Sequence, residues 1–160
     1  MTQRTMFLFA LILSNTLGLG CSTRAYVRHA QTAFALYGVN EAAVPVVETV
    51  CDERAVNAAS DPSVPTATAR VNAERVLENC RTAAQIQHRF AEGHRIWMTT
   101  AAMADGDPER MDIPRSTLLL HQLYDIYVEL AELLREQFGV PLPAVPRLVL
   151  RLLDVPAEAP

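Results

Sequence analysis

Residues 117–134 read TLLLHQLYDIYVELAELL, and their spacing predicts an amphipathic helix. Apolar side chains recur every three or four positions and would cover one broad face: Leu119, Leu120, Leu123, Ile126, Tyr127, Leu130, Leu133 and Leu134. Polar and acidic side chains fall on the opposite face: His121, Asp125, Glu129, Glu132 and Glu136. Asp112 and Pro114 are typical of a helix start, and Gly139 followed by Pro141 predicts the helix end.

A longer helix is expected earlier in the chain, from Arg24 to about Ala59. Pro45 lies inside it and lacks a backbone donor, and Gly38 is a second weak point. We therefore expect a kink or a short break there, with Asn40 able to cap the second half. The stripe that would face a partner helix has one row at seven-residue spacing and an adjacent row: Ala30, Tyr37, Val44, Cys51 and Ala58, then Tyr26, Ala33 and Val47.

The segment SDPSVPT, residues 60–66, is a turn built from two prolines and capping residues. A second helix is expected from there to about Ala104, with Gly93 as a local weak point. Two neighbouring rows at seven-residue spacing would form its packing face: Val76, Ala83, Phe90, Trp97 and Ala104, then Ala73, Cys80, Gln87, His94 and Ala101.

After Gly139 the chain continues as a proline-rich connector and a short amphipathic helix, Arg147 to Asp154. Arg147 and Arg151 would lie on one side of this helix and its leucines on the other. A helix of this length is not stable alone, so we expect it to dock on the bundle rather than to bind a membrane surface. The predicted fold class is all-α: a small antiparallel helical bundle of three long helices and a short C-terminal one.

The first residues differ in composition from the rest of the chain. Arg4 gives a positive start, residues 6–13 (MFLFALIL) are uninterrupted apolar, and small residues lead to Gly20 and Cys21. This order is typical of an export signal. The apolar run is also too short to span a bilayer, which needs roughly 20 residues.

Because it ends in Gly20 and Cys21, the segment resembles the signal peptide of bacterial lipoproteins. In that family the cysteine is acylated and becomes the first residue of the mature protein. The family usually has leucine three residues before the cysteine, where this chain has Gly18. The alternative is an ordinary secretory signal cut nearby, with Cys21 as a spare thiol.

The resemblance implies a lipoprotein-type signal peptide over 1–20. The residue patterns predict a helical bundle over 21–139, and a proline-rich connector, short amphipathic helix and tail over 140–160. The resemblance also implies lipidation at Cys21 and a lipid-anchored place in the bacterial cell envelope. Ser22 after the cysteine implies delivery to the outer membrane, facing the periplasm.

Export would place Cys51 and Cys80 in an oxidising compartment, where a disulfide between them is expected. The alternative is a pair of buried free thiols. Loop-closure entropy gives such a bond about 3 to 4 kcal/mol of stabilisation. In a hairpin centred on residue 63, Cys80 would lie about 7 Å too far along, unless the turn extends to about Ala69 or the helices cross obliquely.

Net charge is −4, and every basic residue is an arginine scattered among carboxylates, so nucleic-acid binding is not expected. His88, Glu92 and His94 do not have the Glu-x-x-His or His-x-x-x-His spacing of helical metal sites. The acidic segment 105–112 fits an EF-hand loop poorly. We therefore predict no metal site, and no nucleophile, phosphate-binding or triad motif is found.

These features predict a non-enzymatic interaction or structural module without a cofactor, tethered to the membrane and binding an unknown envelope protein. The alternative is a periplasmic cofactor- or metal-binding bundle. His94 and Met98 are one helical turn apart and have the ligand types that hold copper or haem.

Overall fold

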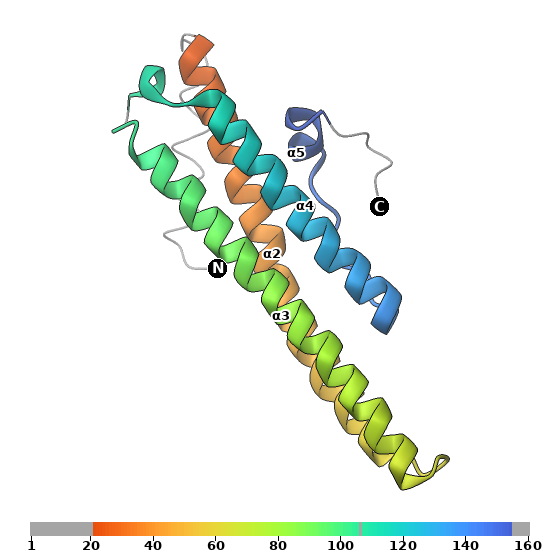
Figure 1. Ribbon diagram of the computed structural model, residues 1–160. Coiled ribbons are helices and arrows are strands. Elements are labelled where there is room, and N and C mark those ends of the chain that lie inside the picture. Colours follow the sequence, from red (N-terminus) through yellow and green to blue (C-terminus); the bar gives the residue numbers. More distant parts are fainter. Residues whose placement is uncertain (1–20, 106, 155–160) are drawn as a thin grey trace, which may run out of the picture.

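The computed structural model describes residues 21–105 and 107–154, with side chains from Thr23 onward. The order of elements is α2 (Cys21–Ser60), α3 (Thr66–Ala102), the 3-10 turn η1 (Pro108–Arg110), α4 (Ile113–Phe138) and α5 (Arg147–Leu152) (Figure 1). No strand occurs among these residues. The predicted fold class, three long helices plus a short fourth, is confirmed.

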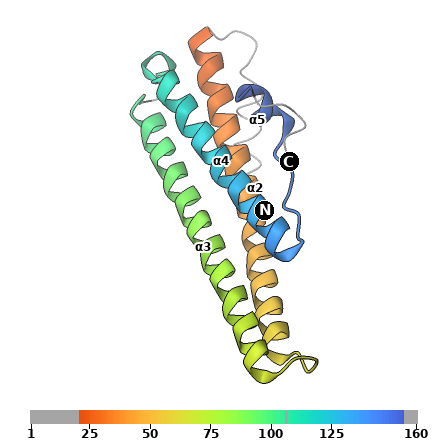
Figure 2. The same cartoon turned by 45° about the vertical axis from the view of Figure 1, so that its right-hand side comes forward.

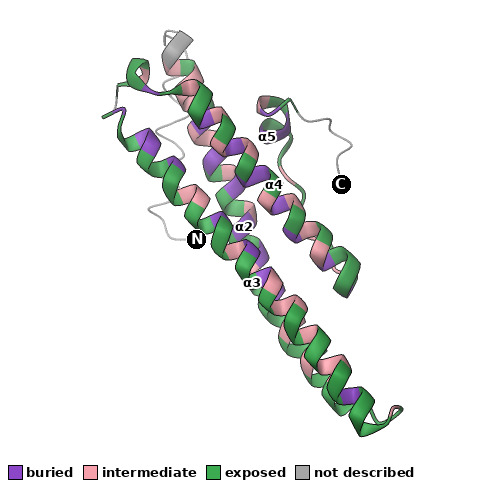
Figure 3. Ribbon diagram, viewed as in Figure 1, coloured by how far each residue is buried: buried purple, intermediate pink, exposed green. Residues whose placement is uncertain are grey.

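The helices α2 and α3 form a long antiparallel hairpin, and α4 packs along the half of it that contains the start of α2 (Figures 1 and 2). The short α5 packs against α2. The core therefore lies in one half of the molecule, where Figure 3 shows most of the buried positions. Its largest fully buried apolar side chains come from all four helices: Leu36, Phe90, Trp97, Leu120, Leu123, Leu130, Leu134 and Val149.

The ends of α4 follow the predicted chemistry. The Asp112 carboxylate accepts a hydrogen bond from the backbone N–H of Arg115 at 3.0 Å, which caps the helix start. Gly139 takes the left-handed conformation with φ 69° and donates its N–H to the carbonyl of Arg135. The predicted boundaries of this helix are therefore confirmed.

The expected break in the first long helix is wrong, because α2 continues without interruption through Gly38 and Pro45. Pro45 cannot donate to the carbonyl of Glu41, but both residues are exposed, so water can satisfy that carbonyl. Asn40 does not cap a second half. It lies inside the helix with only 4% of its surface exposed.

The apolar stripe predicted for this helix is also displaced. Tyr37 is 38% exposed, and the other positions of the seven-residue row are only half-buried. Ala33 and Val47 of the predicted adjacent row are buried, but polar residues share their row, so apolar spacing alone did not identify the rest of it. The buried row consists of His29, Thr32, Ala33, Leu36, Asn40, Ala43 and Val47.

The boundaries of two other helices differ slightly from prediction. α3 ends at Ala102, and Ala104 is buried in the turn that follows. α5 ends at Leu152, two residues before the predicted end. Gly93 does not interrupt α3, and a Cβ there would come within 3.1 Å of Leu123 Cδ2, so this glycine allows α4 to approach closely.

Candidate functional site

The α2–α3 hairpin continues beyond the end of α4 without cover (Figure 1). Two side-chain contacts fix where α4 ends on the hairpin. The Arg54 guanidinium donates to the carbonyl of Phe138 at 3.0 Å, and the Asn79 amide donates to Gln137 Oε1 at 3.1 Å. Residues 55–78 lie beyond these contacts, and we call this two-helix segment the arm.

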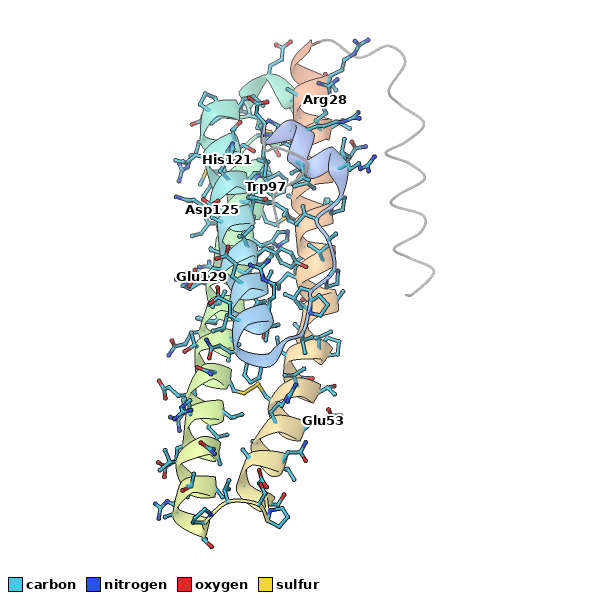
Figure 4. All side chains as sticks on the ribbon, turned by 90° about the vertical axis from the view of Figure 1, so that its right-hand side faces the viewer. Arg28, Glu53, Trp97, His121, Asp125 and Glu129 are labelled. Atoms are coloured by element: carbon cyan, nitrogen blue, oxygen red, sulfur yellow. A yellow bond between two sulfur atoms is a disulfide. The ribbon has the colours of Figure 1, made fainter. Side chains whose placement is uncertain are left out.

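A disulfide between Cys51 and Cys80 closes the base of the arm (Figure 4). The two Cα atoms lie 5.8 Å apart. This bond joins the helices close to the point where α4 stops supporting them. The predicted pairing of Cys51 with Cys80 is therefore present. Because it lies at the base of the arm, this bond holds the two arm helices together.

The register of the hairpin explains how these cysteines meet. The rings of Tyr37 and His94 stack with centroids 4.6 Å apart, and this pair and the disulfide are both centred between residues 65 and 66. A hairpin centred on residue 63 would place residue 75 opposite Cys51, and moving the centre by two to three residues moves the facing position by five, to Cys80. The helix α3 still begins at Thr66, so a turn extending to about Ala69 is not needed.

The surface of the arm combines exposed apolar side chains with ion pairs. Val56, Val71 and Leu77 are 65%, 54% and 46% exposed. Arg70 pairs with Glu74 on the arm, and Glu78 pairs with Arg81 just beyond it, at exposed positions where such pairs add little stability. The arm thus offers an accessible, mixed surface suited to contact with another protein.

A second feature is an aromatic cluster on the α2–α3 hairpin beside the core. The His94 ring stacks on Tyr37 and lies edge-on to Phe34 at 6.5 Å. Burial lowers the pKa of His94, and the nearby Glu41 carboxylate partly opposes that shift. The buried Nε2 atom of His94 has no hydrogen-bond partner among the described residues.

A groove of about 200 Å³ lies next to this cluster, between α2 and α3. Tyr26, Phe34, Trp97 and Met98 line it, whereas His94 does not. Met98 is 40% exposed. Of the His94 and Met98 pair proposed from sequence as ligands, only Met98 thus lines this groove.

The most buried polar arrangement was not predicted. The Trp97 indole N–H donates to Ser116 Oγ at 2.9 Å, and His29 Nδ1 lies 2.8 Å from the same oxygen. Burial lowers the pKa of His29 and favours its neutral form. With the imidazole proton on Nε2, the Ser116 hydroxyl accepts from Trp97 and donates to His29 Nδ1; with the proton on Nδ1, Ser116 Oγ accepts from both.

This serine–histidine pair lacks the access that a nucleophile needs. Ser116 is fully buried and His29 is 6% exposed. The three residues come from α2, α3 and α4, so their hydrogen bonds join all three long helices. No spacing in the sequence brings them together, because His29 and Ser116 are separated by 87 positions.

The remaining sequence candidates are scattered over the surface. His88 and Glu92 are exposed on α3. His121, Asp125 and Glu129 follow the outer face of α4 (Figure 4), and Glu129 pairs with Arg89. Within the described part of the chain, no three His, Cys, Asp or Glu side chains gather closely enough to hold a metal ion.

The predicted lipidation site falls at the edge of the structure. α2 begins at Cys21, but the Cys21 side chain and residues 1–20 lie outside the described residues. None of the described helices is both long and apolar enough to cross a bilayer. No protein-family model, curated protein or solved structure matches this chain.

Proposed function

We propose that this protein is a lipid-anchored module of the bacterial cell envelope that binds a partner protein through its arm and has no enzymatic activity. The observation that carries the proposal is that Cys21 and the arm lie at opposite ends of one uninterrupted 40-residue helix (Figure 1). At 1.5 Å per residue, α2 is about 60 Å long. A lipid on Cys21 would therefore hold the arm at a fixed distance from its anchor.

Three features support a rigid connection between anchor and arm. α2 begins at Cys21 itself, so no flexible spacer separates the proposed lipid from the helix. The buried contacts among His29, Trp97 and Ser116 join the three long helices near that end. The Cys51–Cys80 bond then joins the two arm helices where α4 ends.

The anchor itself rests on the lipoprotein-like signal over residues 1–20 and on Cys21. Acyl chains on that cysteine would attach the protein to the membrane. Ser22 favours the outer membrane, with the module facing the periplasm. Intact mass of the protein from native membranes tests this part: acylated Cys21 supports it, and an uncleaved chain with three free thiols contradicts it.

Site-specific photocrosslinking in the native envelope tests the arm. A photoreactive residue at Val56 or Val71 should give one discrete crosslinked product. Leu118, on α4, is the matched control because it is an apolar side chain with a similar exposure of 59%. Products from Leu118 alone, or identical products from all three positions, would contradict binding through the arm.

The disulfide gives a second test of the same proposal. Replacing both Cys51 and Cys80 by serine should weaken crosslinking from Val56, because the arm loses the covalent link at its base. The helical content of the rest of the protein should remain, since most of the core lies on the side of this bond away from the arm. Unchanged crosslinking would show that partner binding does not depend on a stapled arm.

A second candidate function is the binding of copper or haem through His94, and the unpartnered Nε2 atom favours it. Titration of the full chain with Cu(I) or haem tests this role. One equivalent should bind, and His94→Ala should abolish binding while His88→Ala, which changes an exposed histidine, should not. Equal binding by both variants would exclude His94 as the ligand.

A further inference from the structure

A cavity of about 280 Å³ lies where the connector after α4 runs back toward α5 (Figure 4). One wall is α4, with Val128 and Ala131, and the other is the connector and α5, with Leu142 and Leu150. These side chains make the walls mainly apolar. The cavity is thus formed by two segments that are separated in sequence by the turn at Gly139.

A hydrogen bond holds the connector in place over this cavity. The Tyr127 hydroxyl donates to the carbonyl of Pro143. Burial raises the pKa of Tyr127 to about 12, so the hydroxyl keeps its proton at physiological pH. The proline-rich connector also has little freedom to collapse onto α4, because each proline ring fixes one backbone angle. The hydrogen bond and the prolines therefore keep the connector apart from α4, so the cavity stays open in the folded protein.

The charge around the cavity has one sign. Arg135 and Arg147 are the only charged residues that line it, although the whole chain has a net charge of −4. None of the four ion pairs found among the described residues involves either arginine. Two arginines thus line a mainly apolar cavity, and neither has an ion-pair partner in the described structure.

We propose that this cavity binds a small anionic amphiphile: a carboxylate held by Arg135 and Arg147, with a short alkyl tail between α4 and the connector. Guanidinium groups bind carboxylates through paired charge-assisted hydrogen bonds. At about 30 Å³ per water-sized group, the cavity holds a ligand of roughly nine or ten non-hydrogen atoms, the size of octanoate. The inference is independent of the arm and of what the arm binds.

Calorimetric titration of the full chain in phosphatidylcholine nanodiscs tests the proposal, with empty nanodiscs as the blank. Octanoate should bind with one-to-one stoichiometry. Octanol, which keeps the tail and lacks the charge, should bind at least about tenfold more weakly, and acetate, which keeps the charge and lacks the tail, should not bind measurably. Octanol binding as tightly as octanoate would overturn the role of the arginines.

Matched variants separate the cavity from general charge and lipid effects. Arg135→Gln and Arg147→Gln should each weaken octanoate binding severalfold, and together by at least about tenfold. Arg151→Gln is the control, because Arg151 is an exposed arginine of α5 that does not line the cavity. Ala131→Phe should block the tail while keeping both arginines. If Arg151→Gln weakens octanoate binding as much as Arg135→Gln, or if Ala131→Phe binds octanoate normally, octanoate does not bind in this cavity.

Discussion

His29 Nδ1 lies 2.8 Å from Ser116 Oγ in the buried centre of the bundle. The same oxygen accepts the Trp97 indole N–H at 2.9 Å, so one hydroxyl joins α2, α3 and α4. A buried donor or acceptor left without a partner costs more than a normal hydrogen bond contributes. Correct pairing of these three side chains therefore favours this arrangement of the helices over others with the same apolar contacts.

Replacing Ser116 by alanine should destabilise the protein markedly. The change leaves both Trp97 Nε1 and His29 Nδ1 without their partner in a buried environment. We expect the free energy of unfolding to fall by about 2 kcal/mol. Chemical denaturation of the purified full chain, followed by circular dichroism, measures this change.

Thr117→Ala is the matched control for that variant. Thr117 neighbours Ser116 on α4, but its hydroxyl only donates to the carbonyl of Ile113 within the same helix. The loss there should be about 0.5 kcal/mol. Equal losses in Ser116→Ala and Thr117→Ala would show that the contact between helices contributes nothing special.

Stability should depend on pH through His29. Burial lowers the pKa of His29 below its ordinary value of 6.5. Below pH 6.5 the unfolded chain therefore binds a proton that the folded chain does not, and stability falls as the pH drops toward the folded pKa. Above about pH 6.5 His29 is neutral in both the folded and the unfolded chain, so it no longer lowers the free energy of unfolding.

Denaturation curves at several pH values between 7.5 and 5 test this dependence. The His29→Gln variant should show a smaller decrease in stability over that range than the parent protein. Some decrease should remain, since burial also lowers the pKa of His94. The control is His88→Gln, which changes an exposed side chain and should leave the shape of the curve unaltered. A steeper or unchanged pH dependence in His29→Gln would contradict the prediction.

The sequence predicts the helices well because the signals that define them are local. The apolar spacing from Leu119 to Leu134 and the stop at Gly139 depend only on neighbouring residues. The row Ala83, Phe90 and Trp97 is likewise buried as predicted. In these segments, local propensity and tertiary packing favour the same structure.

The sequence predicts the sites poorly because they depend on packing between helices. Nothing in the spacing of His29 or Ser116 distinguishes them from other polar residues, and only the fold brings them together. The cavity beside Arg135 likewise depends on the path of the connector. Pro45 shows the opposite case: a local helix-breaking signal is overridden because the position faces solvent.

Two glycines should respond to alanine with opposite signs. At Gly38, in the middle of α2, a Cβ would meet nothing within 4 Å, so Gly38→Ala should raise stability by about 0.5 to 1 kcal/mol. At Gly139 there is also open space, but φ is +69°, so Gly139→Ala should lower stability by about 1 kcal/mol. Thermal melts of both variants measure the two shifts. Shifts of the same sign would show that helix propensity does not govern Gly38, or that left-handed strain does not govern Gly139.

Asn40 offers a stabilising substitution on the buried face of α2. It is 4% exposed, and its Oδ1 atom has no hydrogen-bond partner among the described residues. Leucine has a similar branched shape and lacks the unpaired oxygen, so Asn40→Leu should raise the free energy of unfolding by about 1 kcal/mol.

Asn79→Leu is the matched control for Asn40→Leu and should change stability in the other direction. Asn79 donates to Gln137 Oε1 at 3.1 Å, so leucine there removes a contact between α3 and the end of α4. The loss should be about 0.5 kcal/mol, because this contact is exposed. Urea denaturation of both variants measures the difference. A destabilised Asn40→Leu protein would mean that the buried Asn40 amide contributes to stability through its packing, despite its unpartnered oxygen.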